Sequence, residues 1–183
     1  TVAAPASQEL RSLSLALQGA LSERFTAAIA VVAQRASLEE PRAVLREKSQ
    51  GGERDKAGAR RLMVGFADTV GWAPPSFGIL LDAAGLVVAR AGETAGLGAN
   101  LESWSLVEDA LRGIQRDALH VDDNKAYLVA TSPVYVGEQL LGAMLIGWLL
   151  DGALTEDLST TLHAPVALFV GQGQSVRVGS KLG

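Results

Sequence analysis

Residues 77–90 read FGILLDAAGLVVAR, and this stretch decides the fold class. Two apolar runs, 77–81 and 86–90, flank the sequence Asp82-Ala83-Ala84-Gly85. An aspartate side chain accepts hydrogen bonds from the backbone of a tight turn, and glycine tolerates the left-handed backbone on which such turns end. The stretch therefore predicts a β-hairpin rather than a helix.

Three further apolar stretches predict strands after the hairpin, and they span 118–122, 125–136 and 139–149. Turn residues separate them, so each strand should pair antiparallel with its neighbour. Between the hairpin and these strands, apolar residues at helical spacing predict a helix at 101–111. We therefore expect an α+β fold in which residues 77–149 form one antiparallel five-stranded sheet with a helix over one face.

The first 36 residues predict one long helix, from Gln8 to about Ala36. One apolar stripe runs along it at spacings of three and four. Its members are Leu10, Leu13, Leu17, Leu21, Phe25, Ala28 and Val32. A helix of that length extends over about 43 Å at ~1.5 Å per residue, which exceeds the width of a small domain. Part of it should protrude, and a protruding amphipathic helix is typical of a dimer contact or a continuation into a membrane span.

The remaining segments predict shorter elements. A short helix is expected at 42–48 and a second one at 53–70, and a glycine-rich loop is expected at 92–100. After the sheet, a helix should begin at Asp151 or Thr155 and end near His163. Two short strands at 165–170 and 175–178 predict a last hairpin.

Composition excludes several classes of function. Of 183 residues, 48% are hydrophobic and 20% are charged, which suits a packed core rather than a disordered chain. The net charge of −4 argues against nucleic-acid binding, which needs a basic face. The absence of cysteine excludes disulfides, thiolate metal sites and a cysteine nucleophile. The longest apolar run, 140–150, is shorter than the roughly 20 residues of a membrane span, so any membrane contact is expected through flanking segments.

Motifs for catalysis, metals or cofactors are weak throughout. The GxG at 96–98 lacks the third glycine of a dinucleotide loop, and no GxSxG sequence is present. His120 and His163 have no second metal ligand at strand or helix spacing. Carboxylate pairs such as Glu108-Asp109 fall on predicted helices and suit solvated faces. We therefore predict no catalytic residues, no metal site and no cofactor, and we do not expect an enzyme.

The candidates for a ligand pocket are aromatic, hydroxyl-bearing and basic residues. Alternation along a strand puts Tyr127, Thr131 and Tyr135 on one face, and Trp104 lies on the predicted helix. Two arginines that could meet an anion complete the set, Arg90 and Arg112. The alternatives are core packing for the aromatic residues and solvation for the arginines.

The order of these elements resembles the extracytoplasmic PAS-like sensor domains called Cache or PDC domains. Three stretches carry the resemblance: residues 77–90, residues 126–135 (AYLVATSPVY) and residues 141–147 (LGAMLIG). The resemblance covers roughly residues 8–150. It implies a PAS-like core at 37–150 with a long N-terminal signalling and dimer helix at 1–36. Residues 151–183 resemble the start of a second, truncated module or a hairpin that packs on the first domain.

The resemblance also implies a function. Such domains bind small metabolites, often carboxylates or amino acids, between the sheet and the helix after the first hairpin. They pair through the first helix and belong to bacterial inner-membrane histidine kinases, chemoreceptors or cyclic-dinucleotide enzymes. Amino-acid-binding members often carry an aspartate where this chain has Gly147, so amino-acid binding is not carried over. The remaining alternatives are a cytoplasmic PAS- or GAF-like module and a ligand-free scaffold for dimerisation and signal relay.

Overall fold

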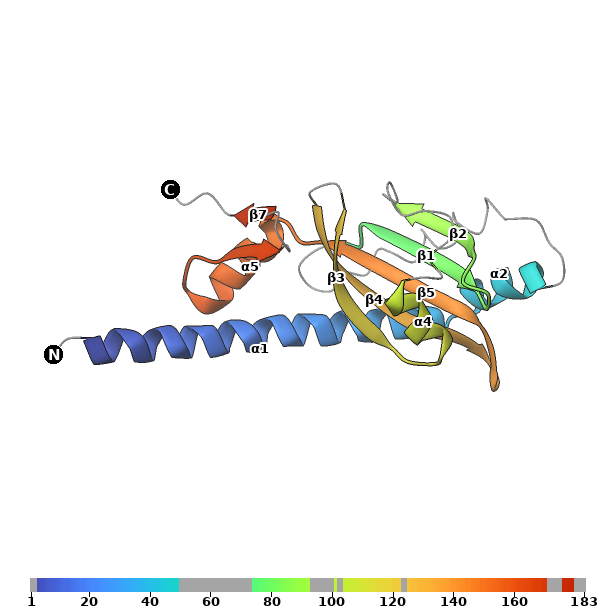
Figure 1. Ribbon diagram of the computed structural model, residues 1–183, viewed down its shortest axis with the longest axis horizontal. Coiled ribbons are helices and arrows are strands. Elements are labelled where there is room, and N and C mark those ends of the chain that lie inside the picture. Colours follow the sequence, from blue (N-terminus) through green and yellow to red (C-terminus); the bar gives the residue numbers. More distant parts are fainter. Residues whose placement is uncertain are drawn as a thin grey trace.

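A computed structural model describes residues 3–49, 74–92, 101, 104–122, 125–170 and 176–179. Its centre is one antiparallel sheet of five strands in the order β2-β1-β5-β4-β3 (Figure 1). The strands are β1 (Phe77–Asp82), β2 (Val87–Gly92), β3 (Arg116–Asp122), β4 (Lys125–Val136) and β5 (Gln139–Leu149). The predicted five-stranded sheet is confirmed. The predicted helix at 53–70 and the loop at 93–100 lie outside the described residues.

The first hairpin turns as its sequence predicts. The Asp82 Oδ1 atom accepts hydrogen bonds from the backbone N–H groups of Ala84 (2.9 Å) and Leu86 (3.0 Å). Gly85 has φ = 76°, a left-handed conformation that costs glycine little. This turn sets β1 against β2, and β1 pairs on its other edge with β5.

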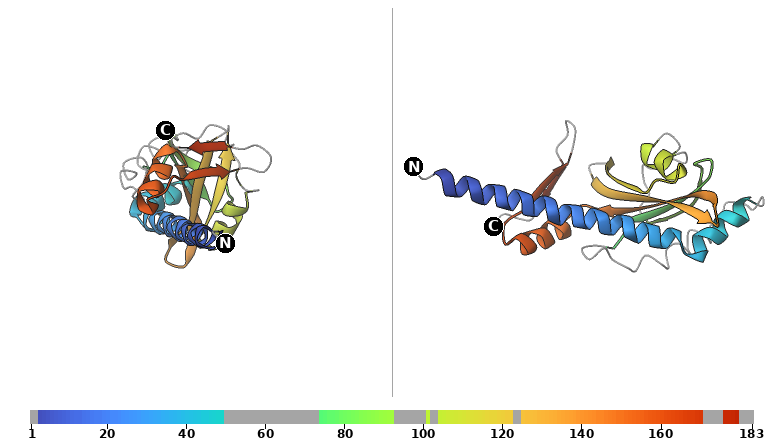
Figure 2. Two further views of the ribbon diagram at one scale, coloured as in Figure 1. Left: turned by 90° about the vertical axis from the view of Figure 1, so that its left-hand side faces the viewer. Right: turned by 90° about the horizontal axis from the view of Figure 1, so that it is seen from below.

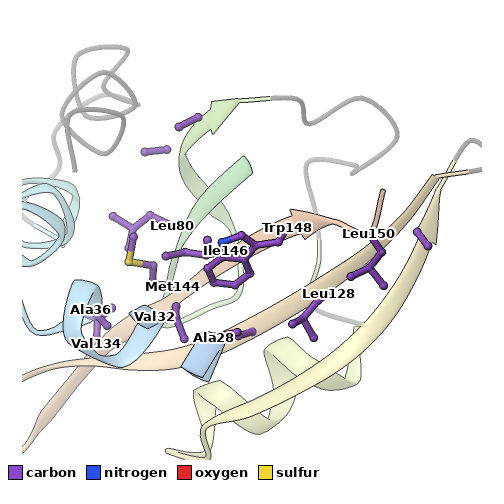
Figure 3. Packing of buried hydrophobic residues seen from close by; sticks show 14 of the residues in the cluster. Ala28, Val32, Ala36, Leu80, Leu128, Val134, Met144, Ile146, Trp148 and Leu150 are labelled. Atoms are coloured by element: carbon purple, nitrogen blue, oxygen red, sulfur yellow. The ribbon is translucent and has the colours of Figure 1, made fainter. Parts of the chain in front are cut away.

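The long N-terminal helix, α1 (Ala3–Ala36), crosses one face of the sheet with its C-terminal part (Figures 1 and 2). Ala28, Val32 and Ala36 are buried there against side chains of β4 and β5, including Trp148 (Figure 3). Leu17, Leu21 and Phe25 of the predicted stripe are partly buried against the same core. The helix begins earlier than predicted, and the side chain of Leu10 lies outside the described residues.

The N-terminal part of α1 extends beyond the sheet, where α5 (Gly152–Leu162) packs on it (Figure 1). The Asp151 side chain caps α5 by accepting from Ala153 N (2.9 Å), so the predicted start at Asp151 is confirmed. Leu154 and Leu158 are fully buried in the core that α1 closes. An ion pair joins Arg24 of α1 to Asp157 of α5. These contacts attach the chain after the sheet to the first helix.

A short helix and a second hairpin lie outside the five-stranded sheet. Helix α2 (Glu39–Ser49) begins three residues earlier than predicted and buries Val44 and Leu45 in the same core. Strands β6 (Ala167–Val170) and β7 (Val176–Gly179) form the predicted last hairpin, a two-stranded antiparallel sheet. In Figure 1, β7 and the first turns of α1 lie at the same end of the molecule.

By length and composition alone, the segment Arg11–Ala36 of α1 could cross a membrane. Little of its length is fully buried, but its last third is packed against the sheet through Ala28, Val32 and Ala36. A helix held in this way along its C-terminal third behaves there as a core helix of the domain.

The opposite face of the sheet carries a second core under α4 (Ser105–Leu111). Leu106, Val107 and Ala110 of α4 are buried against side chains of β1, β4 and β5. The helix confirms the predicted element but is shorter than the expected 101–111, and it gives the sheet the covered face on which a ligand site was predicted.

Candidate functional site

On the face of the sheet under α4, the side chains of paired residues form rows that cross the strands. One row joins Thr131 of β4 to Arg116 of β3 on one side and to Leu145 of β5 on the other. It continues through Ile79 of β1 to Arg90 of β2. A second row, near the start of α4, pairs Tyr127 with His120 of β3 and Leu149 of β5. Both rows lie on the side of α4.

Trp104 is not on the helix, which corrects the sequence prediction. It is the residue before α4 and has extended backbone angles (φ −83°, ψ 120°). Its N–H donates to the carbonyl of Leu101 (2.9 Å), and α4 begins at Ser105, four residues after the predicted start at 101. The indole ring packs on the His120 imidazole, with ring centroids 4.9 Å apart and planes at 52°.

Tyr127 belongs to the second core, with 6% of its surface exposed. Its ring meets the edge of the Phe77 ring at a centroid distance of 5.5 Å and an angle of 66°. Phe77 also lies over Gly147, its cross-strand partner on β5, so a Cβ atom at Gly147 would collide with the Phe77 ring. An aromatic ring thus fills the space above Gly147, the position at which amino-acid-binding members of the resembled family carry a carboxylate.

Thr131 is fully buried and its hydroxyl has partners within the chain. The Oγ1 atom lies 3.2 Å from the carbonyl oxygen of Arg116 and 3.5 Å from that of Leu106. Because a hydroxyl carries one hydrogen, the shorter contact to Arg116 is the better hydrogen bond. The contact ties β4 to the neighbouring strand and to α4 at the middle of the covered face.

Tyr135 lies far from Trp104 and Tyr127. Its hydroxyl lies beside Gly113, after the end of α4, where a Cβ atom on Gly113 would lie 2.6 Å from it. Eight residues of strand separate Tyr135 from Tyr127, about 26 Å at ~3.3 Å per residue. Trp104 and Tyr127 are at the N-terminal end of α4, whereas Tyr135 is at its C-terminal end.

The two candidate arginines differ in position. Arg90 is half-buried on β2 and pairs across the hairpin with Ile79, so it shares the face of the sheet with Thr131. Three strand spacings separate the backbones of Arg90 and Thr131, about 14 Å. The Arg112 side chain is 63% exposed just after α4 and forms an ion pair with Glu108 at 2.5 Å.

Sequence reasoning missed two residues of this region, His120 and Phe77. His120 was considered only as a metal ligand, although its alternation with Ala118 on β3 puts it opposite Tyr127. Burial lowers the pKa of His120 below its ordinary value of 6.5, and the nearby Asp122 carboxylate acts in the opposite direction. Phe77 was assigned only to a strand. The signal that could have found it was Gly147, a residue without a side chain on a neighbouring strand, which leaves space for a large ring. Within the described part of the chain, no three metal-ligating side chains lie together.

Solved structures share this fold. The sensor domain of DcuS from E. coli superimposes with a TM-score of 0.52 at 18% identity, over 81% of this chain and 98% of that domain. The periplasmic domain of LuxQ from Vibrio cholerae has a TM-score of 0.59 at 13% identity, over 93% and 78%. The ligand-binding domain of PctC, an amino acid chemoreceptor of Pseudomonas aeruginosa solved with GABA, has a TM-score of 0.51 at 17% identity, over 92% and 72%.

Neither a protein-family model nor a curated protein matches the sequence. The fold is that of the PDC or Cache type of periplasmic sensor domain, as the resemblance implied. The predicted PAS-like α+β architecture, with its long first helix and five-stranded sheet, is confirmed.

Proposed function

We propose that this chain is the extracytoplasmic, non-catalytic sensing domain of a bacterial membrane receptor, and that it binds a small molecule under α4. The observation that carries the proposal is the covered face of a sensor-type fold, along which aromatic, hydroxyl and basic side chains are distributed. Sensor domains of known receptors share this architecture, and one of them was solved with GABA. These similarities favour the extracytoplasmic role over a cytoplasmic PAS- or GAF-like module.

The ligand we expect is a small carboxylate. Arg90, like Arg116, shares the sheet face with Thr131 and Tyr127, and a guanidinium binds a carboxylate in a two-pronged geometry. The Phe77 ring above Gly147 leaves no room there for a side-chain carboxylate that would hold an amine. Arg112 is the weaker candidate because its side chain is 63% exposed.

The placement of the chain ends supports a receptor with two membrane connections. The first turns of α1 and strand β7 lie at the same end of the domain in Figure 1. We propose that segments flanking both ends lead to the inner membrane and that the domain lies in the periplasm. Residues 151–183 then form a reduced membrane-proximal module, with α5 resting on α1.

We further propose that α1 pairs with the α1 of a second copy. Much of its first half is exposed, and Leu15 in that half has 69% of its surface exposed. Burying such side chains against a partner removes apolar surface from water, which favours association. Sedimentation velocity should show a dimer that Leu15→Glu converts to a monomer; a wild-type protein that stays monomeric at high concentration contradicts this part of the proposal.

A second function has support of its own. Thr131 already makes hydrogen bonds within the chain, and Tyr127 is packed on Phe77. Contacts that are satisfied without a ligand favour a ligand-free domain that relays signals through α1. The experiment below separates the two functions.

The test is thermal unfolding of the domain with panels of small carboxylates, amino acids, purines and divalent cations. A ligand at 100 times its dissociation constant stabilises the folded state by about 2.7 kcal/mol. For a chain of this length that corresponds to a rise in melting temperature of about 5–11 °C. We expect the rise with a carboxylate, and we expect Arg90→Ala or Trp104→Ala to abolish it.

Leu119→Ala is the matched control, because Leu119 neighbours His120 on β3, points to the opposite face and is 48% exposed. This variant should retain the full rise in melting temperature. A rise that survives both Arg90→Ala and Trp104→Ala would place the ligand elsewhere. A panel without any rise would favour the ligand-free relay.

A further inference from the structure

Among the described residues, the N-terminal end of α4 has no side-chain cap. Trp104, the residue before the helix, provides no side-chain hydrogen bond to the free N–H groups of the first turn, a contact that commonly stabilises a helix start. Two described contacts hold this end, the Trp104 backbone bond to Leu101 and the packing of the indole on His120. The other end and the middle of α4 are held by the buried Leu106, Val107 and Ala110.

His120 is a titratable partner for such a contact. It lies on β3, an edge strand of the sheet, and it is half-buried between Trp104 and the sheet. From β4, its cross-strand partner is Tyr127. From its own strand, the charged groups on the same face are Asp122 and Arg116, and Lys125 is the cross-strand partner of the aspartate.

The charges of α4 are engaged elsewhere. Glu108 is paired with Arg112, and Asp109 is paired with Arg116 of β3, each at 2.5 Å. Of the described charged groups, Asp122 is therefore the one that acts on the His120 ring, and its attraction for an imidazolium is outweighed by burial, the larger of the two effects on the His120 pKa. A ring that loses hydration when buried favours its neutral form. Protonation of His120 accordingly favours a state in which the ring is more hydrated than it is between Trp104 and the sheet.

We propose that the Trp104–His120 ring contact is a proton-sensitive latch that holds the N-terminal end of α4 on the sheet. Neutral His120 keeps the latch closed, and protonation opens it. This inference rests on the proposed function in one respect: α4 covers the face on which the ligand is proposed to bind. A latch there makes access to that face depend on acidity, so the domain would report external pH together with its ligand.

The first measurement is an NMR titration of the two histidines in the ligand-free domain between pH 4.5 and 8. His163 ends α5, and His163→Asn assigns the two sets of signals because asparagine also suits the left-handed backbone there (φ = 50°). We expect His120 to titrate below pH 6.5 and its pKa to rise in Trp104→Ala, where the ring regains water. An unchanged pKa in Trp104→Ala would overturn the latch.

The second measurement is hydrogen exchange of the α4 amides 106–110 at pH 7.5 and pH 5.0, corrected for the intrinsic pH dependence of exchange. Protection of these amides relative to those of β4 should fall at pH 5.0, tenfold for each pH unit by which the His120 pKa differs between closed and open states. His120→Phe keeps a ring against Trp104 without a titratable group, so it should remove the pH step. His120→Gln provides a second neutral variant should the phenylalanine fail to fold.

Equal protection of α4 at both pH values in the wild type would refute the latch, as would a pH step that persists in His120→Phe or His120→Gln. Both measurements use the ligand-free domain. A flat ligand panel with an intact pH step would therefore reject only ligand binding, and a carboxylate-dependent rise in melting temperature without the pH step would reject only the latch.

Discussion

Replacing Gly147 by alanine should destabilise the domain by overpacking its second core. The new Cβ atom would lie within 3.0 Å of three carbon atoms of the Phe77 ring, a separation that requires a movement. Phe77 has 2% of its surface exposed, and its ring is also in edge contact with Tyr127. The ring therefore has to displace further buried side chains in order to yield.

The magnitude follows from comparable core substitutions. Forcing an extra methyl group into a packed core costs about 1–3 kcal/mol. For a chain of this length, each kcal/mol lowers the melting temperature by about 2–4 °C. We expect Gly147→Ala to unfold about 2–12 °C below the wild type. Phe77→Ala alone should cost about 3–5 kcal/mol because it opens a cavity.

The assay is a double-mutant cycle by chemical and thermal unfolding. The double variant Phe77→Ala/Gly147→Ala should be less destabilised than the sum of the single variants, because the alanine methyl then enters the space that the ring has left. Gly19→Ala is the matched control: its site on α1 is open, and alanine is a better helix former, so stability should rise by up to about 1 kcal/mol. This reasoning would be refuted if Gly147→Ala were as stable as the wild type, or if the losses of stability in the two single variants were strictly additive in the double variant.

Three further predictions concern other contacts. In a double-mutant cycle measured by urea unfolding, Arg24→Ala and Asp157→Ala should show a coupling energy of about 1 kcal/mol, because the ion pair joins α1 to α5 and is partly exposed. Purely additive effects of the two substitutions would contradict this link between the helices. Because the pKa of folded His120 is lowered, the stabilising contribution of this residue should be complete above about pH 6.5 and decrease as the pH falls below that value. Thermal unfolding of the wild type and of His120→Gln at pH 5 and 7.5 would measure this decrease. Asp82→Ala should lower the unfolding free energy by about 1–3 kcal/mol, because it removes two turn hydrogen bonds, and a neutral result would show that Gly85 alone forms the turn.

The sequence predicted the elements whose signals are local. Turn chemistry at Asp82 and Gly85, strand alternation and the apolar stripe of the first helix each depend on residues close together in the chain. The five-stranded sheet, the start of α5 at the first of the two predicted positions, Asp151, and the last hairpin were predicted for this reason and are confirmed. The kinds of residue in the candidate site could also be predicted in part, because residues 127 and 131 are an even number of positions apart and therefore share one face of their strand.

Tertiary structure decided which of those residues meet. The sequence grouped Tyr135 with Tyr127, but α4 is too short to cover both, and the two lie at opposite ends of it. Likewise, the contact of the Phe77 ring with Gly147 joins two different strands. The contact of the Trp104 indole with His120 joins the start of a helix to a strand. Contacts of this kind depend on strand order and on the crossing of a helix over a sheet. Alternation and turn signals within single segments therefore determined the elements, whereas packing between distant segments determined the site.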